Sequence, residues 1–388
     1  MRVTQISIIH KPLEPRIFER QCRQLAAVGH EVHLIVPGPP CERLEGVRFH
    51  SIAPDSDRPS PRRQIGRLWR AARAAWGLRP SVFHLHDPHL VPLGILLGFA
   101  GSRVVYDVHE DYVAYARAKH PTRPLRGTLK ALAWTVLEGL ARRRFDAFVC
   151  ASPSLARRFP SERTVVIHNF PRHQDFASAA GRSRPYGERP NTVVITGYLR
   201  GLRCFWEIAQ ALELLPEELN CRLRAIGAFR PPELAARARS HPVWRKLDLL
   251  PWQRHDVVVR ELLDARIGLD LVAPVPNNDD PIRSNKLFEY MAAGIPLIAS
   301  DMTPWRELVG GIGCGLVVDP HAPEAIAAAI EHLLRNPGDA EEMGARGRAA
   351  IWKGLNWNRE APRLLALYQA LEGKQRRIEP PSRVVIAA

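Results

Sequence analysis

The segment Asp270–Asp301 reads DLVAPVPNNDDPIRSNKLFEYMAAGIPLIASD and changes character several times along its length. It begins as a short apolar strand, passes through a polar loop, and continues as a helix that starts at about Ser284. A Gly-Ile-Pro turn at 294–296 ends this helix and leads into another apolar strand. Strand, helix and strand in this order predict a parallel βαβ unit.

The same alternation of strands and helices extends outward from this segment through most of the chain. Two series of short Val/Ile-rich strands are expected, near 3–9, 31–36, 47–51, 82–85, 103–108, 146–150 and 164–167, and near 192–198, 222–226, 247–250, 266–271, 296–299 and 314–318. The fold class is therefore α/β, with two Rossmann-like doubly wound domains. Such domains bind ligands at the carboxyl ends of their strands, here facing a shared cleft.

Composition changes along the chain predict the domain boundaries. We expect an N-terminal domain at 1–172 and a C-terminal domain at 191–355. The stretch 173–190, HQDFASAAGRSRPYGERP, is small, polar and aperiodic, which is typical of an interdomain linker. A helix at 356–373 is expected to pack back toward the N-terminal domain, and 374–388 to form a flexible tail.

Composition limits the class of protein. The 388 residues are 46% hydrophobic and carry a net charge of +15, which excludes wholesale disorder and fits nucleic acid, anionic lipid or a phosphate-bearing substrate. The six cysteines form no CxxC pair, as expected for reduced thiols. The first apolar stretch is too short for a signal peptide, and the longest, Leu90–Ala100, is interrupted by Pro92. We expect a cytoplasmic protein, with peripheral contact to the inner face of a membrane as an open alternative.

The helix that starts near Ser284 has the features of an anion site. Ser284 is a suitable N-cap, and the first amides of a helix bind anions. Lys286 lies in the first turn, where a cation is unfavourable for the helix but favourable for a bound phosphate. Glu289 lies one turn further on, where its carboxylate can accept hydrogen bonds from two vicinal hydroxyls, as a ribose presents.

The run SNKLFEYMAAGIPLIASD closely resembles the nucleotide-sugar motif of retaining GT-B glycosyltransferases of the group 1, or family-four, class. The resemblance implies the GT-B architecture and a donor site in the C-terminal domain. It assigns the donor ribose to Glu289. It also implies that the diphosphate and hexose are bound at the helix start, by Ser284, Asn285, Lys286 and Leu287.

A second resemblance lies at 193–212, VVITGYLRGLRCFWEIAQAL, where a basic loop joins a strand to a helix. In the family, basic residues of this loop neutralise the donor pyrophosphate, which implies this role for Arg203 and, as a second cation, Arg200. Ordinary surface charge is the alternative for both. The family also places base-contacting loops near Trp252, which is predicted either to line that pocket or to belong to the core.

Two positions depart from the family pattern. Pro281 stands where the family often has a first Glu that touches sugar hydroxyls, so the identity of the hexose is open, and Asp279 or Asp280 is a candidate substitute. Cys204 replaces a customary Gly after the basic loop. Both departures allow a catalytically inactive paralogue.

In the N-terminal half, Asp107–Asp111 (DVHED) follows a strand and again resembles the family, which implies that His109 contacts the transferred sugar. We predict that His109 orients the sugar or the acceptor hydroxyl; a satisfied buried histidine is the alternative. Glu110 is a further candidate for contact with the acceptor. Arg16, near the start of the first helix, is predicted to hold a phosphate of the acceptor or the leaving pyrophosphate, with a local salt bridge as the alternative.

Histidines near the strand 82–85 invite a metal-site interpretation. His84 and His86 share one strand face, and His89, Asp107 and His109 are expected nearby. Because the family resemblance implies enzymes that work without metal, we predict no metal and no other cofactor.

Two Arg-rich helices are expected in the same half. Arg63, Arg67 and Arg70 fall on one helical face, and apolar residues fall on another. A second helix, 125–144, ends in three arginines. Basic amphipathic helices suggest docking on anionic lipid, and a solvated basic surface is the alternative.

The predicted function is transfer of a hexose-type sugar from a UDP- or GDP-sugar to a carbohydrate or lipid-linked acceptor. We expect retention at the anomeric carbon and a role in cell-surface polysaccharide or glycolipid assembly. The main alternative is an inactive paralogue that binds a nucleotide sugar and serves as a scaffold. A sugar-nucleotide 2-epimerase lacks a visible acid/base carboxylate set, and no nucleic-acid-binding module is recognisable, so we expect no nucleic-acid partner.

Overall fold

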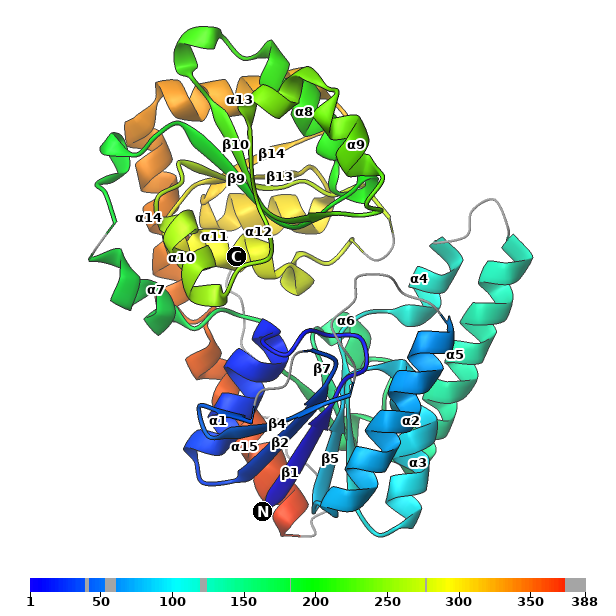
Figure 1. Cartoon of the computed structure of the whole chain (residues 1–388). Helices are drawn as coiled ribbons and strands as arrows, with labels where there is room; N and C mark the ends of the chain where they lie inside the picture. The colour runs from blue at the N-terminus through cyan, green and yellow to red at the C-terminus, as the bar shows by residue number, and fades with distance from the viewer. Residues whose placement is uncertain (39–41, 53–60, 119–123, 182, 276–277, 374–388) are drawn as a thin grey trace. The chain divides into compact units, whose positions relative to one another are not determined.

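A computed structural model describes the chain except for residues 39–41, 53–60, 119–123, 182, 276–277 and 374–388. The described residues divide into two compact units (Figure 1). Unit 1 contains 1–169 together with the last helix from Asn358 onward, and unit 2 contains 170–357. The predicted tail, 374–388, lies outside the described residues.

Unit 1 is built on an eight-stranded sheet in the order β3-β4-β2-β1-β5-β6-β7-β8. Its strands are β1 (Arg2–Ile6), β2 (Glu31–Val36), β3 (Arg43–Leu44), β4 (Val47–Ser51), β5 (Val82–Leu85), β6 (Arg103–Val108), β7 (Ala147–Cys150) and β8 (Thr164–Val166). All neighbouring pairs are parallel except β3 and β4. The strand order reverses direction between β1 and β5, and ligands of doubly wound sheets bind at this switch point.

Helices cover both faces of this sheet (Figure 1). They are the π-wound η1 (Pro15–Cys22), α1 (Arg23–Ala27), α2 (Pro61–Leu78), the short η2 (Pro88–Leu90), α3 (Val91–Phe99), α4 (Tyr112–Ala118), α5 (Pro124–Arg144), α6 (Pro153–Ala156) and α15 (Trp357–Glu372). α2, α3 and α5 pack on one face, where their buried residues share a core with β1, β5 and β6. α15 packs beside β5, because the hydroxyl of Tyr368 lies 2.8 Å from Nδ1 of His84.

Unit 2 has a fully parallel six-stranded sheet in the order β11-β10-β9-β12-β13-β14. Its strands are β9 (Thr192–Leu199), β10 (Arg222–Phe229), β11 (Leu247–Leu250), β12 (Ile267–Asp270), β13 (Leu297–Ser300) and β14 (Gly315–Val318). Its helices are α7 (His173–Ala180), α8 (Phe205–Leu214), α9 (Leu234–Arg239), α10 (His255–Leu263), α11 (Asn285–Ala293), α12 (Thr303–Ile312), α13 (Pro323–Arg335) and α14 (Pro337–Lys353). The switch point of this sheet lies between β9 and β12.

The predicted α/β class and both strand series are confirmed, with ends shifted by a few residues. β3 was not predicted, because a two-residue strand carries no periodicity. The polar stretch expected as a linker at 173–190 contains α7, which packs against α10 and α11. One buried aromatic, Phe176, anchors this helix, and a single apolar residue among polar ones gives no helical pattern.

The structure shows where the arginines and tryptophans of α2 lie. Arg67 donates a hydrogen bond to the carbonyl of Ile8 at 3.2 Å, and Arg70 donates one to the carbonyl of Ile52. These two arginines therefore bind backbone of unit 1, whereas Trp69 and Trp76 point outward. Small alanines, Ala71 and Ala75, rather than the tryptophans, fill the interface between α2 and the sheet.

Among the described residues, no helix combines the length and the apolar character needed to cross a bilayer.

Close packing of α3 against the sheet is testable at two glycines of that helix. A Cβ at Gly94 would lie 2.5 Å from Leu85 Cδ1 and 2.7 Å from Phe145 Cζ, whereas one at Gly98 would lie 3.7 Å from Val104 Cγ2. We expect Gly94→Ala to lower the free energy of unfolding by about 1–2 kcal/mol, because overpacking outweighs the gain in helix propensity. The matched control Gly98→Ala should leave stability unchanged or raise it. Equal denaturation midpoints for the two variants would contradict this packing.

Candidate functional site

A buried carboxylate organises the switch point of unit 2. Asp270 ends β12 and is 1% exposed. Its Oδ1 accepts a hydrogen bond from Nη1 of Arg203 at 3.2 Å, and its Oδ2 accepts one from the Ser284 hydroxyl. Asp270 thus ties the basic loop after β9 to the first residue of α11.

Ser284 occupies the N-cap position of α11, as predicted, but its side chain makes no capping hydrogen bond to the helix. Its hydroxyl is committed to Asp270 instead. The first amides of α11 therefore receive no capping bond from this hydroxyl. Helix amides of this kind are a ready site for an anion.

Lys286 lies in the first turn of α11 and its side chain extends along β9. Gly197, with φ of 95°, makes room for it, since a Cβ there would lie 3.2 Å from Lys286 Cε. Burial and the nearby Arg203 lower the pKa of Lys286 to about 7, although Asp270 opposes the shift. The Lys286 amine therefore gains or loses its proton near neutral pH.

The remaining predicted residues of α11 have different exposures. Glu289 is buried, with 7% exposure, one turn after Lys286. Oδ1 of Asn285 is buried and has no hydrogen-bond partner among the described residues. Leu287 is fully buried in the core of unit 2, so only its backbone is available to a ligand.

Two further residues that are predicted to bind the sugar donor, Arg200 and Trp252, lie near the end of β9. Arg200 follows β9 and is partly buried, and it contributes to the lowered pKa of Lys286. Trp252 is 39% exposed and packs edge-on against Tyr198, with ring centroids 5.0 Å apart. Trp252 is thus not a core residue, and its position beside the end of β9 fits the predicted base contact without testing it.

The buried carboxylate of unit 1 is Asp107, in β6. Arg16 donates to it from Nη2 at 2.7 Å and from Nε at 3.0 Å, and Gln21 donates at 2.6 Å. Burial alone would raise the pKa of Asp107, but Arg16 and His109 hold it well below its usual range. The prediction that Arg16 holds a substrate phosphate is therefore corrected, because Arg16 is 1% exposed and committed to Asp107.

His109 lies directly after β6 at the edge of this buried group. Its Nε2 is 3.2 Å from His86 Nδ1 and 3.4 Å from Asp107 Oδ2, and its side chain is 12% exposed. The inward position of Nε2 leaves Nδ1 as the ring nitrogen directed away from Asp107. Glu110, the next residue, is exposed. The contacts of His109 and Glu110 with substrate stay predictions.

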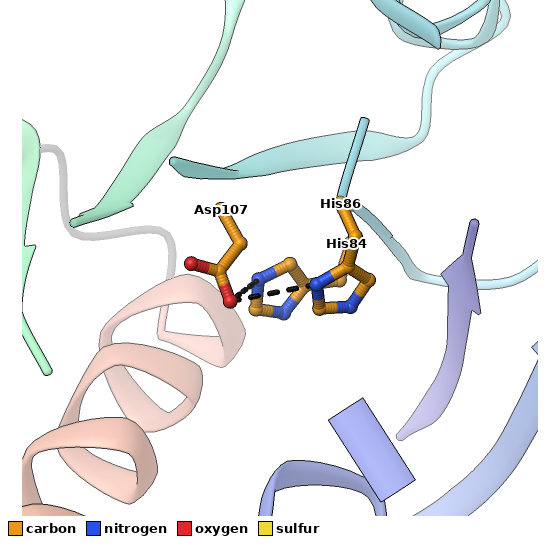
Figure 2. Close-up of side chains that lie close together, drawn as sticks. All are labelled: His84, His86 and Asp107. Carbon is orange, nitrogen blue, oxygen red and sulfur yellow. Dashed lines mark ion pairs between the residues drawn. The ribbon is translucent and has the colours of Figure 1, made fainter. Parts of the chain in front are cut away.

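His84, His86 and Asp107 bring potential metal-ligand atoms within 4.8 Å of one another. Figure 2 shows the two imidazoles turned toward one oxygen of Asp107. Nε2 of His86 lies 2.7 Å from Oε1 of Gln5, and the Arg16 guanidinium already compensates the carboxylate. A metal ion at this place would lie against that guanidinium, so the group fits a hydrogen-bonded network better than a metal site.

A second group in unit 1, which the sequence did not reveal, lies at the switch point between β1 and β5. Nδ1 of His10 lies 3.2 Å from Oδ1 of Asp87, whose Oδ2 accepts hydrogen bonds from Ser7 Oγ at 2.9 Å and Ile8 N at 2.6 Å. Burial alone would lower the pKa of His10, but Asp87 raises it to about 9. His10 is thus a cation at neutral pH, and its ring centroid lies 5.2 Å from that of His109.

Comparison with protein families decides the class of this chain. The family model described as Glycosyltransferase Family 4 matches residues 16–171, and the model described as Glycosyl transferases group 1 matches residues 188–350. The chain belongs to the group 1 glycosyltransferases. The second match includes the basic loop after β9 and all of α11, and the first includes β6 and His109.

Individual relatives agree with this assignment. A phosphatidyl-myo-inositol mannosyltransferase of Mycobacterium tuberculosis is 27% identical over 78% of this chain and 77% of its own length. A GDP-mannose-dependent alpha-mannosyltransferase of Mycolicibacterium smegmatis is 23% identical over 90% and 92%. Sucrose-phosphate synthase from Thermosynechococcus elongatus aligns with a TM-score of 0.73 at 18% identity, over 96% of this glycosyltransferase and 99% of that chain. The chain therefore has the GT-B fold, and the two α/β units are its two domains.

Asp270 and His10 are residues of these sites that sequence reasoning missed. Asp270 stands at the end of an apolar strand, which is a signal for a ligand-side residue in parallel sheets. His10 gives no such signal, because its charge depends on Asp87, which is 77 positions away in the sequence.

The pKa of Lys286 predicts a pH dependence of anion binding in this glycosyltransferase. If a diphosphate binds at the start of α11, it holds Lys286 protonated, so above about pH 7 binding must take up a proton and affinity should fall by up to about tenfold per pH unit. The measurement is the Kd for a UDP- or GDP-sugar between about pH 6 and pH 9. Lys286→Arg, which stays charged, is the control and should flatten the profile. A pH-independent Kd for the wild type would contradict the assignment.

Proposed function

We propose that this glycosyltransferase moves a hexose from a UDP- or GDP-sugar to a carbohydrate or lipid-linked acceptor, of which we favour the lipid-linked one. We also propose that the anomeric configuration is retained. One observation carries the proposal. Arg203 and Lys286 meet at the uncapped start of α11, and buried Glu289 follows one turn later. Cations and helix amides suit a diphosphate, and a buried carboxylate suits a ribose diol.

The proposed mechanism stabilises the leaving group. As the bond between the anomeric carbon and the diphosphate oxygen breaks, negative charge grows on the diphosphate, beside Lys286, Arg203 and the first amides of α11. Fixed cations placed where charge develops lower the barrier without reorganisation. The acceptor oxygen bonds to the anomeric carbon from the face that the diphosphate leaves, and its proton passes to the departing phosphate oxygen. This route gives retention and requires no enzymic nucleophile, metal or other cofactor.

The acceptor proposal draws on unit 1. His109 directs Nδ1 away from Asp107 and is available to orient a hydroxyl of the acceptor, with the partly exposed His10 beside it. The name of the M. tuberculosis relative specifies a phosphatidylinositol acceptor, and that of the M. smegmatis relative specifies GDP-mannose. The first name supports a glycolipid acceptor and the second a GDP-sugar donor, and we extend this to a role in glycolipid or cell-surface assembly at the inner face of a membrane. Phosphatidylinositol and GDP-mannose are therefore the first substrates to test.

A second candidate function, a nucleotide-sugar-binding scaffold without turnover, is favoured by the loop before α11. Pro281 is buried where the family often has a sugar-binding Glu. The two candidate substitutes are otherwise engaged, since Asp279 pairs with Arg283 at 2.8 Å and Asp280 caps Ile282 N at 3.2 Å. Release of nucleotide from a nucleotide sugar in the presence of acceptor separates an enzyme from a scaffold.

Replacing Glu289 tests the donor site. We expect Glu289→Ala to weaken binding of GDP-mannose or UDP-glucose at least about tenfold, because charge-assisted hydrogen bonds to the ribose contribute about 1.5–3 kcal/mol. Isothermal titration of the folded variant measures this change. Glu307→Ala removes an exposed carboxylate from α12 and serves as the matched control. Unchanged affinity in Glu289→Ala would overturn the ribose assignment.

Replacing His109 tests the catalytic assignment. We expect His109→Ala to bind nucleotide sugar normally and to transfer sugar about a hundredfold more slowly, the scale of a lost positioning contact. Nucleotide affinity of the same variant is the internal control, since the proposed nucleotide contacts all lie in unit 2. A wild-type transfer rate would leave His109 as a structural histidine.

A further inference from the structure

Three helices of unit 1 carry an unusual set of exposed apolar side chains. They are 40–73% exposed and comprise Ile65, Trp69 and Trp76 of α2, Leu96 and Phe99 of α3, and Leu125, Leu129, Leu132, Val136 and Leu140 of α5. We call this set the apolar face. Single exposed apolar residues are ordinary, but a contiguous group marks an interaction site.

The residues of the apolar face point in one direction. α2, α3 and α5 bury their opposite sides in one core on the same side of the eight-stranded sheet, through Ala71, Ala75, Leu93, Leu97 and Ala141. The outward residues of three helices in one layer must therefore point away from that sheet. Figure 1 shows the three helices along one flank of unit 1.

The spacing within α5 shows a continuous stripe. Leu125, Leu129, Leu132, Val136 and Leu140 follow steps of four, three, four and four, which place successive residues on one side of a helix. In a soluble helix such a stripe faces a core. Here it is the exposed side of α5, while Ala131 and Ala141 are buried.

Charge identifies the partner. α2 contains five arginines and no acidic residue, and α3 has no charged residue. α5 contains four arginines, Lys130 and a single acidic residue, Glu138, which is buried and bonded to Arg158. Arg144 stacks over Phe99 at 4.8 Å, so charge and apolar surface lie together. An apolar surface with a basic surround matches the interface of an anionic bilayer, where tryptophan also prefers to lie.

We propose that the apolar face inserts into the headgroup and upper acyl region of an anionic membrane. The proposal names the membrane partner of the suggested lipid-linked transfer and to that extent rests on the proposed function, although docking itself requires no catalysis. The sequence alone suggested docking through the basic side of α2, but Arg67 and Arg70 of that side bind backbone carbonyls. The proposed insertion instead depends on apolar contact as well as charge. A second copy of the chain is a poorer occupant, since it would bring the same positive charge to the interface.

Sedimentation of the full chain with vesicles tests the proposal. We expect binding to phosphatidylcholine vesicles that contain phosphatidylglycerol, and weaker binding to phosphatidylcholine alone. Leu129→Gln/Leu132→Gln should reduce the partition coefficient at least about tenfold. The matched control, Val28→Gln/Leu214→Gln, replaces two comparably exposed apolar side chains that lie outside the apolar face, and it should bind vesicles as wild type does. A surface change of this kind leaves the core intact, which thermal unfolding checks.

Tryptophan fluorescence provides a second measurement. Brominated lipids should quench the fluorescence of the wild-type protein. Trp69→Phe/Trp76→Phe should bind vesicles but lose most of the quenching, because the seven remaining tryptophans do not belong to the apolar face. Failure to bind anionic vesicles, or equal binding by Leu129→Gln/Leu132→Gln, would overturn the proposal. So would a dimer in analytical ultracentrifugation that these two substitutions dissociate, since the occupant would then be a second copy.

The outcome is separable from that of the proposed function. Binding of the nucleotide sugar by Leu129→Gln/Leu132→Gln should match wild type, because the proposed donor residues lie in unit 2. Intact vesicle binding without sugar transfer would count against the enzyme function alone. Transfer to a water-soluble acceptor without vesicle binding would count against the apolar face alone.

Discussion

A carboxylate buried at the carboxyl end of a parallel strand must be supplied with donors, and this requirement organises both halves of the molecule. Asp270 is satisfied by Arg203 and Ser284, so the basic loop after β9 and the start of α11 are drawn to one point. Asp107 is satisfied by Arg16 and Gln21 from the first helix of the chain. Removing one partner of a buried pair costs about 3–5 kcal/mol, so neither arrangement is incidental.

The architecture was predictable because parallel sheets have buried strands on both faces, and these read as continuous Val/Ile runs. Thirteen strands were placed from such runs, and the helices followed from the spaces between them. The exceptions are instructive. β3 is too short to show a period, and α7 depends on Phe176, whose burial is a property of the folded unit rather than of the local sequence.

The candidate site was predictable only where its residues are close in the sequence. Ser284, Lys286 and Glu289 form one local pattern, and a helix start dictates what each can do. Arg16 was misplaced because its partner, Asp107, lies 91 residues away, and a sequence offers nearer carboxylates first. The apolar face was missed for a related reason. An amphipathic pattern shows that a helix has two sides, but it does not show which side meets the sheet.

The electrostatics of α11 indicate why an anion of high charge suits this site. Arg203 and Lys286 stand near the positive end of the helix, and Asp270 supplies one compensating charge. Burial and the nearby Arg203 together lower the pKa of Lys286, so its charged form is disfavoured there despite Asp270. A diphosphate carries enough charge to balance both side chains and the helix end, whereas a single carboxylate does not. The proposed donor would supply the negative charge that these cations lack, and this interaction strengthens as the diphosphate gains charge on leaving.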